Sequence, residues 1–411
     1  MEVVNPVCCG LDIHKARISA CLLRPRPDGQ VQKEIQSFGT MTRDLEKLAA
    51  WLAAADCPIV AMESTGVYWQ PIWNVLEERF TLLLVNARHV KAVPGRKTDV
   101  RDSEWLAELL RHGLLRGSFV PNREQRELRE LARYRTALIQ ERVDHINRLQ
   151  KTLESANLKL ASVASSVVGV SAREMLRRLV TDEAVAPAEL AELARGRLRE
   201  KIPLLQEALR GTLGAHHRFM IPRILGMIEL LEEQITTLDQ EIEARQRPFV
   251  EAVERLDTIP GVGQRTAEIL VAEVGVDLSR FPTAGHLASW AGLCPGNHES
   301  AGKRLSGRTR KGNAALRAAL VEAAQAAGRT KTSYLGAQYR RLARRRGSKK
   351  AAVAVAHSIL VLAYHLLTSS KPYDDLGADS FERRAPADQD QALIRRLERK
   401  GYTVTKPETA A

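Results

Sequence analysis

The sequence is poor in aromatic residues and in paired cysteines. Phe, Trp and Tyr make up 5% of the 411 residues, and with Leu, Ala and Arg prominent instead, this composition favours helices. The five cysteines are odd in number and form no CxxC pair, which argues against a disulfide framework and a structural zinc site and for a reducing compartment. They are Cys8, Cys9, Cys21, Cys57 and Cys294.

Targeting signals and long apolar runs are scarce as well. The first residues, MEVVNPVCCGLD, lack the basic and apolar regions of a signal peptide. An apolar run of 17 residues, 351–367, contains His357, Ser358 and His365, so it predicts a buried core helix rather than a membrane span. We therefore expect no membrane partner. A hydrophobic content of 44% excludes wholesale disorder.

Acidic residues are nearly absent from one segment of the chain. The formal net charge is +13, yet the basic block, defined as Lys303–Lys350, holds 15 Lys and Arg against one acid, Glu322. The remainder carries 47 basic and 48 acidic residues and is almost neutral. A local block of positive charge indicates a polyanionic partner.

The pattern of strand-like, helix-like and polar segments predicts four regions. Residues 1–118 alternate strand-like and helix-like runs, as in an α/β domain with a central sheet. Residues 119–255 are helical, 256–370 form a second and mostly helical domain, and 371–411 form a polar tail. A length of 411 residues is consistent with two or three domains.

Apolar residues in the middle region recur at steps of four and three. This seam runs from Ile224 to Ile242 and ends before Arg247 and Pro248. It predicts either a coiled coil or an amphipathic helix packed on its own domain, and the spacing alone does not separate the two.

Four carboxylates of the first region form a candidate metal site. Asp12 lies within a predicted strand, Glu63 ends another, and Asp99 and Asp102 lie three apart at the start of a helix. Together they could bind Mg²⁺. Two such ions about 4 Å apart can activate an oxygen nucleophile and stabilise the oxygen that leaves the phosphate. Each carboxylate also has a structural interpretation, as the partner of a basic neighbour or of a helix N-terminus.

A glycine-rich turn, IPGVGQRTA from residue 259, resembles a helix-hairpin-helix motif. Its two glycines permit a tight turn, and the following helix would offer free backbone N–H groups to a phosphate. The alternative is an ordinary helical turn. The expected nucleic-acid contacts of this turn are Gly261, Gly263, Gln264, Arg265 and Thr266.

Two serines lie beside basic residues in the segment NHESAGKRLSGRTRKGN. A serine hydroxyl needs a base, a metal or a cationic field to act as a nucleophile, and without one Ser300 and Ser306 are ordinary loop residues of a basic surface. The expected nucleic-acid contacts of this segment are Lys303, Arg304, Arg308, Arg310 and Lys311.

Taken in order, these motifs resemble one family. The strings GLDIHK, MESTGVYW, KTDVRD, IPGVG, HLASWAGLCPG, SAGKR and RKGNAALR are similar to those of insertion sequence 110 transposases, which are also called bridge-RNA-guided recombinases. The resemblance covers roughly residues 5–115 and 255–367.

The resemblance implies a fold, a reaction and partners. It implies an RNase H-type, RuvC-like domain whose DEDD set, Asp12, Glu63, Asp99 and Asp102, binds Mg²⁺, followed by a coiled coil and a serine transposase domain. Ser300 best matches the nucleophile, although Ser-Ala-Gly replaces Ser-Gly here, which leaves Ser306 as a second candidate. The implied partners are donor and target DNA, a guide (bridge) RNA and further copies of the chain, as a homodimer or homotetramer. The implied location is the prokaryotic cytoplasm, at the nucleoid.

The sequence is therefore consistent with three functions. The first is a recombinase that joins strands through a serine–phosphate linkage with assistance from the carboxylates. The second is a RuvC-like nuclease that leaves free nicked ends and needs no serine. The third is a DNA-binding protein without catalysis, which the acidic set and the resemblance disfavour.

Overall fold

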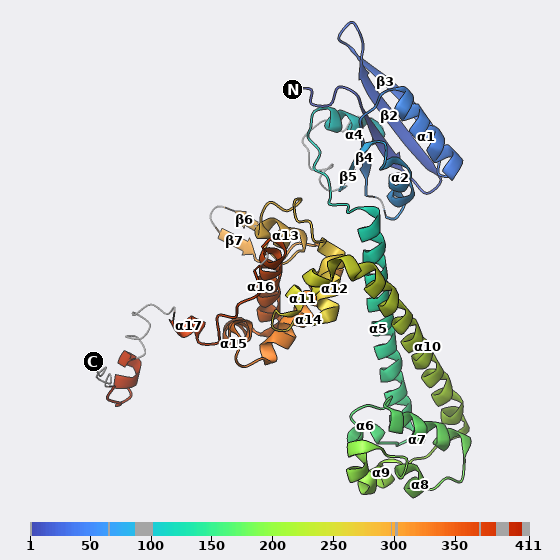
Figure 1. Cartoon of the computed structure of the whole chain (residues 1–411), viewed down its shortest axis with the longest axis vertical. Coiled ribbons are helices and arrows are strands. Elements are labelled where there is room, and N and C mark those ends of the chain that lie inside the picture. The colour runs from blue at the N-terminus through green and yellow to red at the C-terminus, as the bar shows by residue number, and fades with distance from the viewer. Residues whose placement is uncertain are drawn as a thin grey trace. The chain divides into compact units, whose positions relative to one another are not determined.

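The computed structural model describes residues 2–64, 66–86, 102–296, 298–300, 303–369, 371–383 and 394–404. The side chains of residues 298–300, 303–305, 382 and 383 are outside this description. The chain divides into two compact units, Met1–Arg126 and Glu127–Ala411 (Figure 1). The finer division into four regions stays a prediction.

The first unit is a mixed α/β sheet domain. Its strands are β1 (Cys8–Ile13), β2 (Arg17–Pro25), β3 (Val31–Gly39), β4 (Ile59–Glu63) and β5 (Thr81–Val85). Its helices are α1 (Thr42–Ala54), α2 (Trp69–Leu76) and α4 (Asp102–Arg111). The predicted α/β character of this region is confirmed.

The five strands lie in the order β3-β2-β1-β4-β5. β1, β2 and β3 form an antiparallel meander, whereas β4 pairs parallel with both β1 and β5. Because β1 and β4 are parallel neighbours, their carboxyl ends meet at the same edge of the sheet. This edge is called the acidic edge below, since Asp12 and Glu63 lie on it.

The two faces of the sheet are covered by different helices. Leu11 and Met62 belong to a buried cluster with residues of α1 and α2, among them Leu45 and Ile72. Side chains alternate between faces along a strand, and Ala61 accordingly packs with residues of α4 in a separate cluster. Helix α1 forms as its Leu45, Leu48 and Leu52 spacing predicts, with those three leucines buried.

Four of the five cysteines are buried in this sheet domain. Burial raises the pKa of the Cys8 and Cys21 thiols to about 12 and that of Cys57 to about 11. All five cysteines are free thiols, in agreement with the spacing argument, and such protonated, buried thiols act as small apolar core residues.

The second unit is mostly helical, with one short hairpin. Its first elements are α5 (Arg123–Ser155, which begins in the first unit), α6 (Leu160–Val163), α7 (Val170–Thr181), α8 (Pro187–Ala191), the 3-10 helix η1 (Gly196–Lys201), α9 (Ile202–Ala208) and α10 (Ala215–Gln246). They are followed by the 3-10 helix η2 (Arg247–Phe249), α11 (Val250–Asp257), α12 (Gln264–Val274), α13 (Ala284–Trp290), β6 (His298–Ser300), β7 (Lys303–Ser306), α14 (Ala314–Arg329), α15 (Tyr334–Arg346), α16 (Ser348–Thr368) and α17 (Ser380–Arg383).

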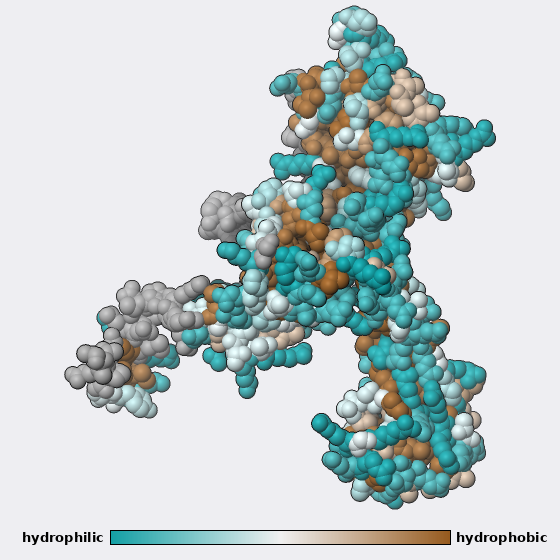
Figure 2. Space-filling model, viewed as in Figure 1, coloured by the Kyte–Doolittle hydropathy of each residue, from teal (hydrophilic) through white to brown (hydrophobic). Residues whose placement is uncertain are grey.

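The two longest helices, α5 and α10, run antiparallel and pack on each other within the chain. Leu138 of α5 packs with Leu231 and Ile235 of α10. Nearer the start of α5, Leu128 packs with Ile242, near the end of α10. Figure 2 shows brown residues along the line between these helices and teal on their outer faces. The predicted seam is therefore covered by α5 of the same chain, so its spacing gives no separate support for contacts between subunits.

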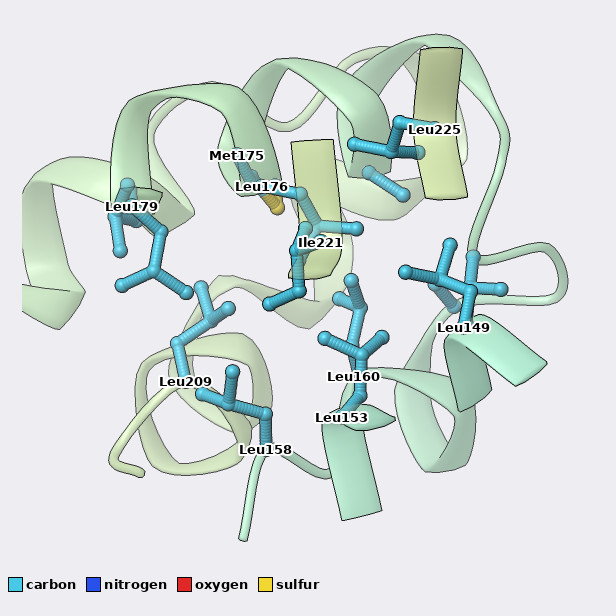
Figure 3. Packing of buried hydrophobic residues seen from close by; sticks show 14 of the residues in the cluster. Leu149, Leu153, Leu158, Leu160, Met175, Leu176, Leu179, Leu209, Ile221 and Leu225 are labelled. Carbon is cyan, nitrogen blue, oxygen red and sulfur yellow. The ribbon is translucent and has the colours of Figure 1, made fainter. Parts of the chain in front are cut away.

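The far end of this helix pair carries a helical cap with its own core. Side chains from the ends of α5 and α10 meet those of α6, α7, α8 and α9 in one buried cluster. Figure 3 shows Leu153, Met175 and Ile221 converging from three of these elements. The short helices between residues 155 and 215 are thus held by a shared apolar centre.

The apolar run predicted as a core helix forms α16. This helix is long and apolar enough to cross a membrane by length and composition, with 44% of its most apolar window buried. Its buried face includes Val355, Ile359 and Leu360, and it packs beside α11, α13, α14 and α15. The Tyr364 hydroxyl donates to the Phe281 carbonyl at 3.0 Å, which joins the last turns of α16 to the segment before α13.

Candidate active site and nucleic-acid interface

Asp12 and Glu63 lie next to each other on the acidic edge. Leu11 pairs with Met62 in the parallel register of β1 and β4, and Asp12 and Glu63 are the next residue of each strand. Neighbouring strands are about 4.8 Å apart, and residues in step project to the same face. Both are two residues beyond the paired Gly10 and Ala61, so both carboxylates project to the face that α4 covers.

Helix α4 starts at this same edge. A Cβ on Gly10 would come within 2.4 Å of the Ser103 carbonyl and 2.5 Å of the Ala107 amide nitrogen, so the α4 backbone lies directly on β1. The Ser103 hydroxyl is 3.4 Å from that of Ser19, and Ser19 pairs with Asp12 across β1 and β2. Asp102, the exposed first residue of α4, precedes Ser103 and therefore begins the helix beside Asp12.

His14 is a neighbour of this set that the sequence did not single out. Its Nε2 lies 3.2 Å from Oδ2 of Asp12, with 61% of the His14 side chain and 27% of the Asp12 side chain exposed. His14 directly follows the last residue of β1, two positions beyond Asp12. By contrast, Glu104 is engaged elsewhere: it accepts from Lys33 at 2.7 Å, and this bond raises the pKa of Lys33.

Asp12 and Glu63 lie side by side on the acidic edge, and α4 begins near that edge with Asp102. The fourth, Asp99, lies outside the described residues. Among the residues that are described, no group of three or more His, Cys, Asp or Glu side chains is arranged closely enough to hold a metal ion. The donors present at the edge are carboxylate oxygens, the ligand type that Mg²⁺ prefers.

The glycine-rich turn joins α11 to α12 as predicted. Gly261 has φ +88°, and a Cβ there would lie 2.3 Å from the Ala323 carbonyl, so the turn rests on α14 and requires glycine. Gly263 caps α12 with extended backbone, and Gln264 and Arg265 are exposed while Thr266 is half-buried. The Arg265 guanidinium donates to Asp239 of α10 at 3.0 Å, so its charge is already partly neutralised.

The two candidate serines lie on a β-hairpin that the sequence did not predict. In the pairing of β6 with β7, Ser300 is opposite Lys303 at the turn end, and Ser306 is opposite His298 at the other end. The side chains of Ser300, Lys303 and Arg304 are outside the described residues. The exposed Ser306 accepts from the Arg308 amide at 3.2 Å, so its hydroxyl serves a local turn.

The base of this hairpin is closed by two glycines. A Cβ on Gly312 would lie 2.3 Å from the Gly292 amide nitrogen, and a Cβ on Gly292 would lie 2.8 Å from that of Gly312. The backbones of the WAGLCPG and RKGNAALR segments are therefore in direct contact, and no larger residue fits either position. Above this glycine contact, Arg308, Arg310 and Lys311 are exposed and make no ion pair within the part of the chain that the structure describes.

A buried glutamate, Glu273, anchors the end of the loop that carries Arg308, Arg310 and Lys311. Glu273 of α12 is fully buried and bonded by Arg133 of α5 at 2.6 and 2.9 Å, with the Arg129 guanidinium 3.1 Å away. It also accepts from the Asn313 side chain at 2.6 Å, and Asn313 caps α14 through the Leu316 amide. No sequence spacing marks Glu273, because its partners come from distant positions in the chain.

Two protein-family models match the chain, one in each half. The model DEDD_Tnp_IS110, described as "Transposase", matches residues 9–158. A model described as "Transposase IS116/IS110/IS902 family" matches residues 253–340. The first match contains the acidic edge, and the second contains the glycine-rich turn, the hairpin and most of the basic block.

Several relatives carry matching names. A "Transposase for insertion sequence element IS1111A" from Coxiella burnetii is 28% identical over 297 residues, 71% of this chain and 72% of the relative. A "Probable family 20 transposase" from Pseudomonas aeruginosa is 27% identical over 77% of this chain and 85% of its own length. A "Pilin gene-inverting protein" from Moraxella bovis is 30% identical over 34% of this chain and 46% of its own length.

Proposed function

Because the chain belongs to the IS110 family of transposases, enzymes that cut and rejoin DNA, we propose that it joins DNA strands through a serine–phosphate intermediate. In this proposal Asp12, Glu63, Asp99 and Asp102 hold divalent metal, Ser300 is the nucleophile, and a guide RNA selects the DNA. The reaction is phosphoryl transfer at a DNA phosphodiester.

The observation that carries the proposal is the acidic edge. Asp12 and Glu63 are in step on adjacent parallel strands, and α4 starts beside them with Asp102. Carboxylates on neighbouring strands repel one another, and a bound cation would offset this repulsion. The mixed sheet supports, at a coarser level, the RNase H-type, RuvC-like fold that the resemblance implies.

The carboxylates would supply the metal site, and the metal is proposed to be Mg²⁺. When bound, such an ion polarises a phosphate oxygen and offsets negative charge that develops in the transition state. Half-exposed Asp12 and exposed Asp102 leave room for a phosphate group to approach this edge. His14, whose Nε2 lies 3.2 Å from Asp12, limits the orientations of this carboxylate.

The proposed strand transfer has two balanced steps. The Ser300 oxygen attacks a DNA phosphorus and loses its proton to solvent, while one deoxyribose oxygen leaves and takes up a proton. The Ser–O–P bond keeps the energy of the broken phosphodiester, so a second DNA hydroxyl can displace the serine without any cofactor that carries energy. Basic residues of the hairpin and its loop stabilise the phosphate charge in both steps.

The test is to substitute each serine separately. Ser300→Ala should abolish covalent protein–DNA adducts and recombination, and Ser306→Ala should keep both, because the Ser306 hydroxyl serves the Arg308 turn. Adducts are detected as protein that stays on labelled DNA in denaturing gels. If Ser300→Ala retained them and Ser306→Ala lost them, the nucleophile would be Ser306.

A metal-dependent, RuvC-like nuclease without a covalent intermediate is the second candidate, and the same carboxylates favour it. It predicts free nicked ends in both serine variants and no adduct in the wild-type protein. Loss of all strand cleavage in Ser300→Ala, with DNA binding retained, would exclude this nuclease.

The remaining parts of the proposal rest on the family. Donor and target DNA follow from transposase activity, and a guide RNA and the nucleoid as the place of action are proposed with it. A homodimer or homotetramer is also proposed, and it would use surfaces other than the seam that α5 covers. The Gly263–Thr266 turn is proposed as a helix-hairpin-helix contact to a phosphate backbone, supported by its exposed position.

A further inference from the structure

The basic block does not form a single surface. Two of its arginines are used inside the fold: Arg317 donates to the Gly292 carbonyl at 3.3 Å, and Arg340 donates to the Thr330 and Lys331 carbonyls at 3.0 and 2.8 Å. The other described residues of the block that face solvent gather in separate places. One is the loop with Arg308, Arg310 and Lys311, called the loop surface below.

The second place is the corner between α15 and α16. Every residue from 344 to 350 is exposed, and five of the seven are basic. These five, called the basic corner, are Arg344, Arg345, Arg346, Lys349 and Lys350. None of them makes an ion pair with any residue that the structure describes.

Within the described residues, no acidic group forms an ion pair with this corner. Helices α15 and α16 contain no Asp or Glu. Asp375, which packs on α15, accepts from the amide of Tyr334 at the opposite end of that helix, about 15 Å from Arg344 at 1.5 Å per residue. Five like charges held on two rigid helices and unpaired repel one another, and an external anion relieves this repulsion.

The corner and the loop surface lie at opposite ends of α16. The loop side is fixed by the Tyr364 bond to Phe281, whose ring packs on Trp290 with centroids 5.4 Å apart, and by the Asn313 amide, which donates to the Trp290 carbonyl at 3.4 Å. The corner lies at the first turn of α16. Lys350 and Tyr364 are 14 residues apart in this helix, which places them about 20 Å apart along its axis. Figure 1 shows α16 running from α15 to α13 and the hairpin.

We propose that the basic corner binds the phosphate backbone of duplex DNA at a flank roughly six base pairs from the strand-joining point, given 3.4 Å per base pair. This rests on the proposed function, since the loop surface marks the joining point only if Ser300 or Ser306 is the nucleophile. The contact reads no bases and fixes the direction of the duplex along α16. DNA is the partner because it continues on both sides of the bond that a transposase cuts.

The form of the corner fits a nucleic-acid backbone better than a lipid surface. The apolar residues of α16, such as Ala352, Val355 and Ile359, are buried inside the unit, so the corner presents charge without an apolar face to enter a bilayer. Figure 2 shows hydrophilic residues around α15. Arginines and lysines that neutralise phosphates release counterions, and this release makes binding strongly salt-dependent.

The test is the salt dependence of binding by the full-length chain carrying Ser300→Ala, so that no strand chemistry intervenes. The probe is a 30-base-pair duplex of arbitrary sequence, with the association constant measured between about 50 and 200 mM salt. Replacing Arg345, Lys349 and Lys350 by alanine should make the log–log slope shallower by about 2.7, or about 0.9 for each phosphate that the variant no longer neutralises. Replacing Arg308, Arg310 and Lys311 as well should add a second decrease, because one duplex engages both surfaces.

A matched variant separates position from net charge. Arg148, Lys151 and Arg197 are exposed in the helical middle region, and their alanine variant removes the same charge and should leave the slope unchanged. An equal slope in the corner variant and the parent would overturn the proposal. So would a change seen only with a 30-nucleotide single-stranded RNA probe, which would assign the corner to RNA. Failure of the serine assignment appears instead in the adduct assay.

Discussion

Two carboxylates of the sheet domain and two of the helical unit have opposite environments. In the sheet domain, Asp12 keeps 27% of its side chain exposed, and Asp102 is exposed at a helix start. In the helical unit, Glu268 and Glu273 are buried on α12 and held by arginines of α5. An accessible carboxylate is free to meet a cation or a substrate, whereas a buried one enclosed by guanidinium groups stabilises the fold and is unavailable for chemistry.

The largest effect is expected at Asp12, on the acidic edge. Asp12→Asn should lower strand joining by about 10²-fold or more, the scale for loss of a group that stabilises transition-state charge. It should change the free energy of unfolding by less than about 1 kcal/mol, because the side chain is partly exposed. Recombination assays and urea unfolding check the two parts, with Asp28→Asn in the β2–β3 turn as the control. A large loss of stability with activity retained would make Asp12 a structural residue.

The opposite outcome is expected for Glu273. Its removal leaves two arginines and Asn313 without their shared acceptor, so Glu273→Ala should destabilise the helical unit by about 3–5 kcal/mol. Denaturant unfolding followed by far-UV circular dichroism measures this. Glu251→Ala, at an exposed position of α11, removes the same charge and should cost less than about 0.5 kcal/mol. Equal effects of the two substitutions would contradict the structural role.

Gly10 lies under α4, the helix that begins near the acidic edge. A Cβ there meets the α4 backbone, which must move, so Gly10→Ala should destabilise the sheet domain by about 1–3 kcal/mol and lower strand joining. Gly226→Ala in α10, where the added Cβ meets nothing within 4 Å, should stabilise its helix by up to about 1 kcal/mol. Thermal unfolding distinguishes the opposite signs, and a neutral Gly10→Ala would contradict the close contact.

The smallest effect is expected at Glu77, a paired carboxylate of the sheet domain. Arg126 donates to both of its oxygens at 2.8 Å and holds the pKa of Glu77 below its usual range. A lowered pKa in the folded state gives stability that is present above the ordinary value near 4.5 and lost as the pH falls through the folded value. Glu77→Gln should therefore cost about 1–2 kcal/mol at pH 7, and the difference from the wild-type protein should shrink below pH 4.5.

The control for this titration is Glu46→Gln, on an exposed position of α1. It should leave the pH profile of unfolding unchanged. A cost for Glu77→Gln that stayed constant down to pH 3 would show that the packing of the side chain, and not its charge, stabilises the unit.

Much of the fold was accessible from the sequence because local periodicity dictates it. The strand-like runs of β1 and β4, the leucine spacing of α1 and the apolar run of α16 each formed the predicted element. The β6–β7 hairpin was missed, since its polar, glycine-rich sequence has no alternation. Which helix covers the Ile224–Ile242 seam depends on a partner about 100 residues earlier in the chain, and no local pattern encodes that pairing.

The candidate site was also predicted only in part. A carboxylate within a strand pointed to Asp12, and a carboxylate at the end of a strand pointed to Glu63. The roles of Glu273 and Asn313 depend on a contact between α12 and α14, and the division of the basic block depends on the length of α16. Charge density can be read from a sequence, but the side chains that neutralise a charge are known only from the fold.

The contact between Gly292 and Gly312 gives the intervening segment a modular character. Because the two backbones meet, residues 293–311 leave α13 and return to α14 through the same point, as a closed excursion of the chain. The free energy of closing a loop grows only slowly with its length, so an insertion in this excursion should cost little and displace neither helix. The glycine contact therefore fixes the ends of α13 and α14 independently of the residues between them.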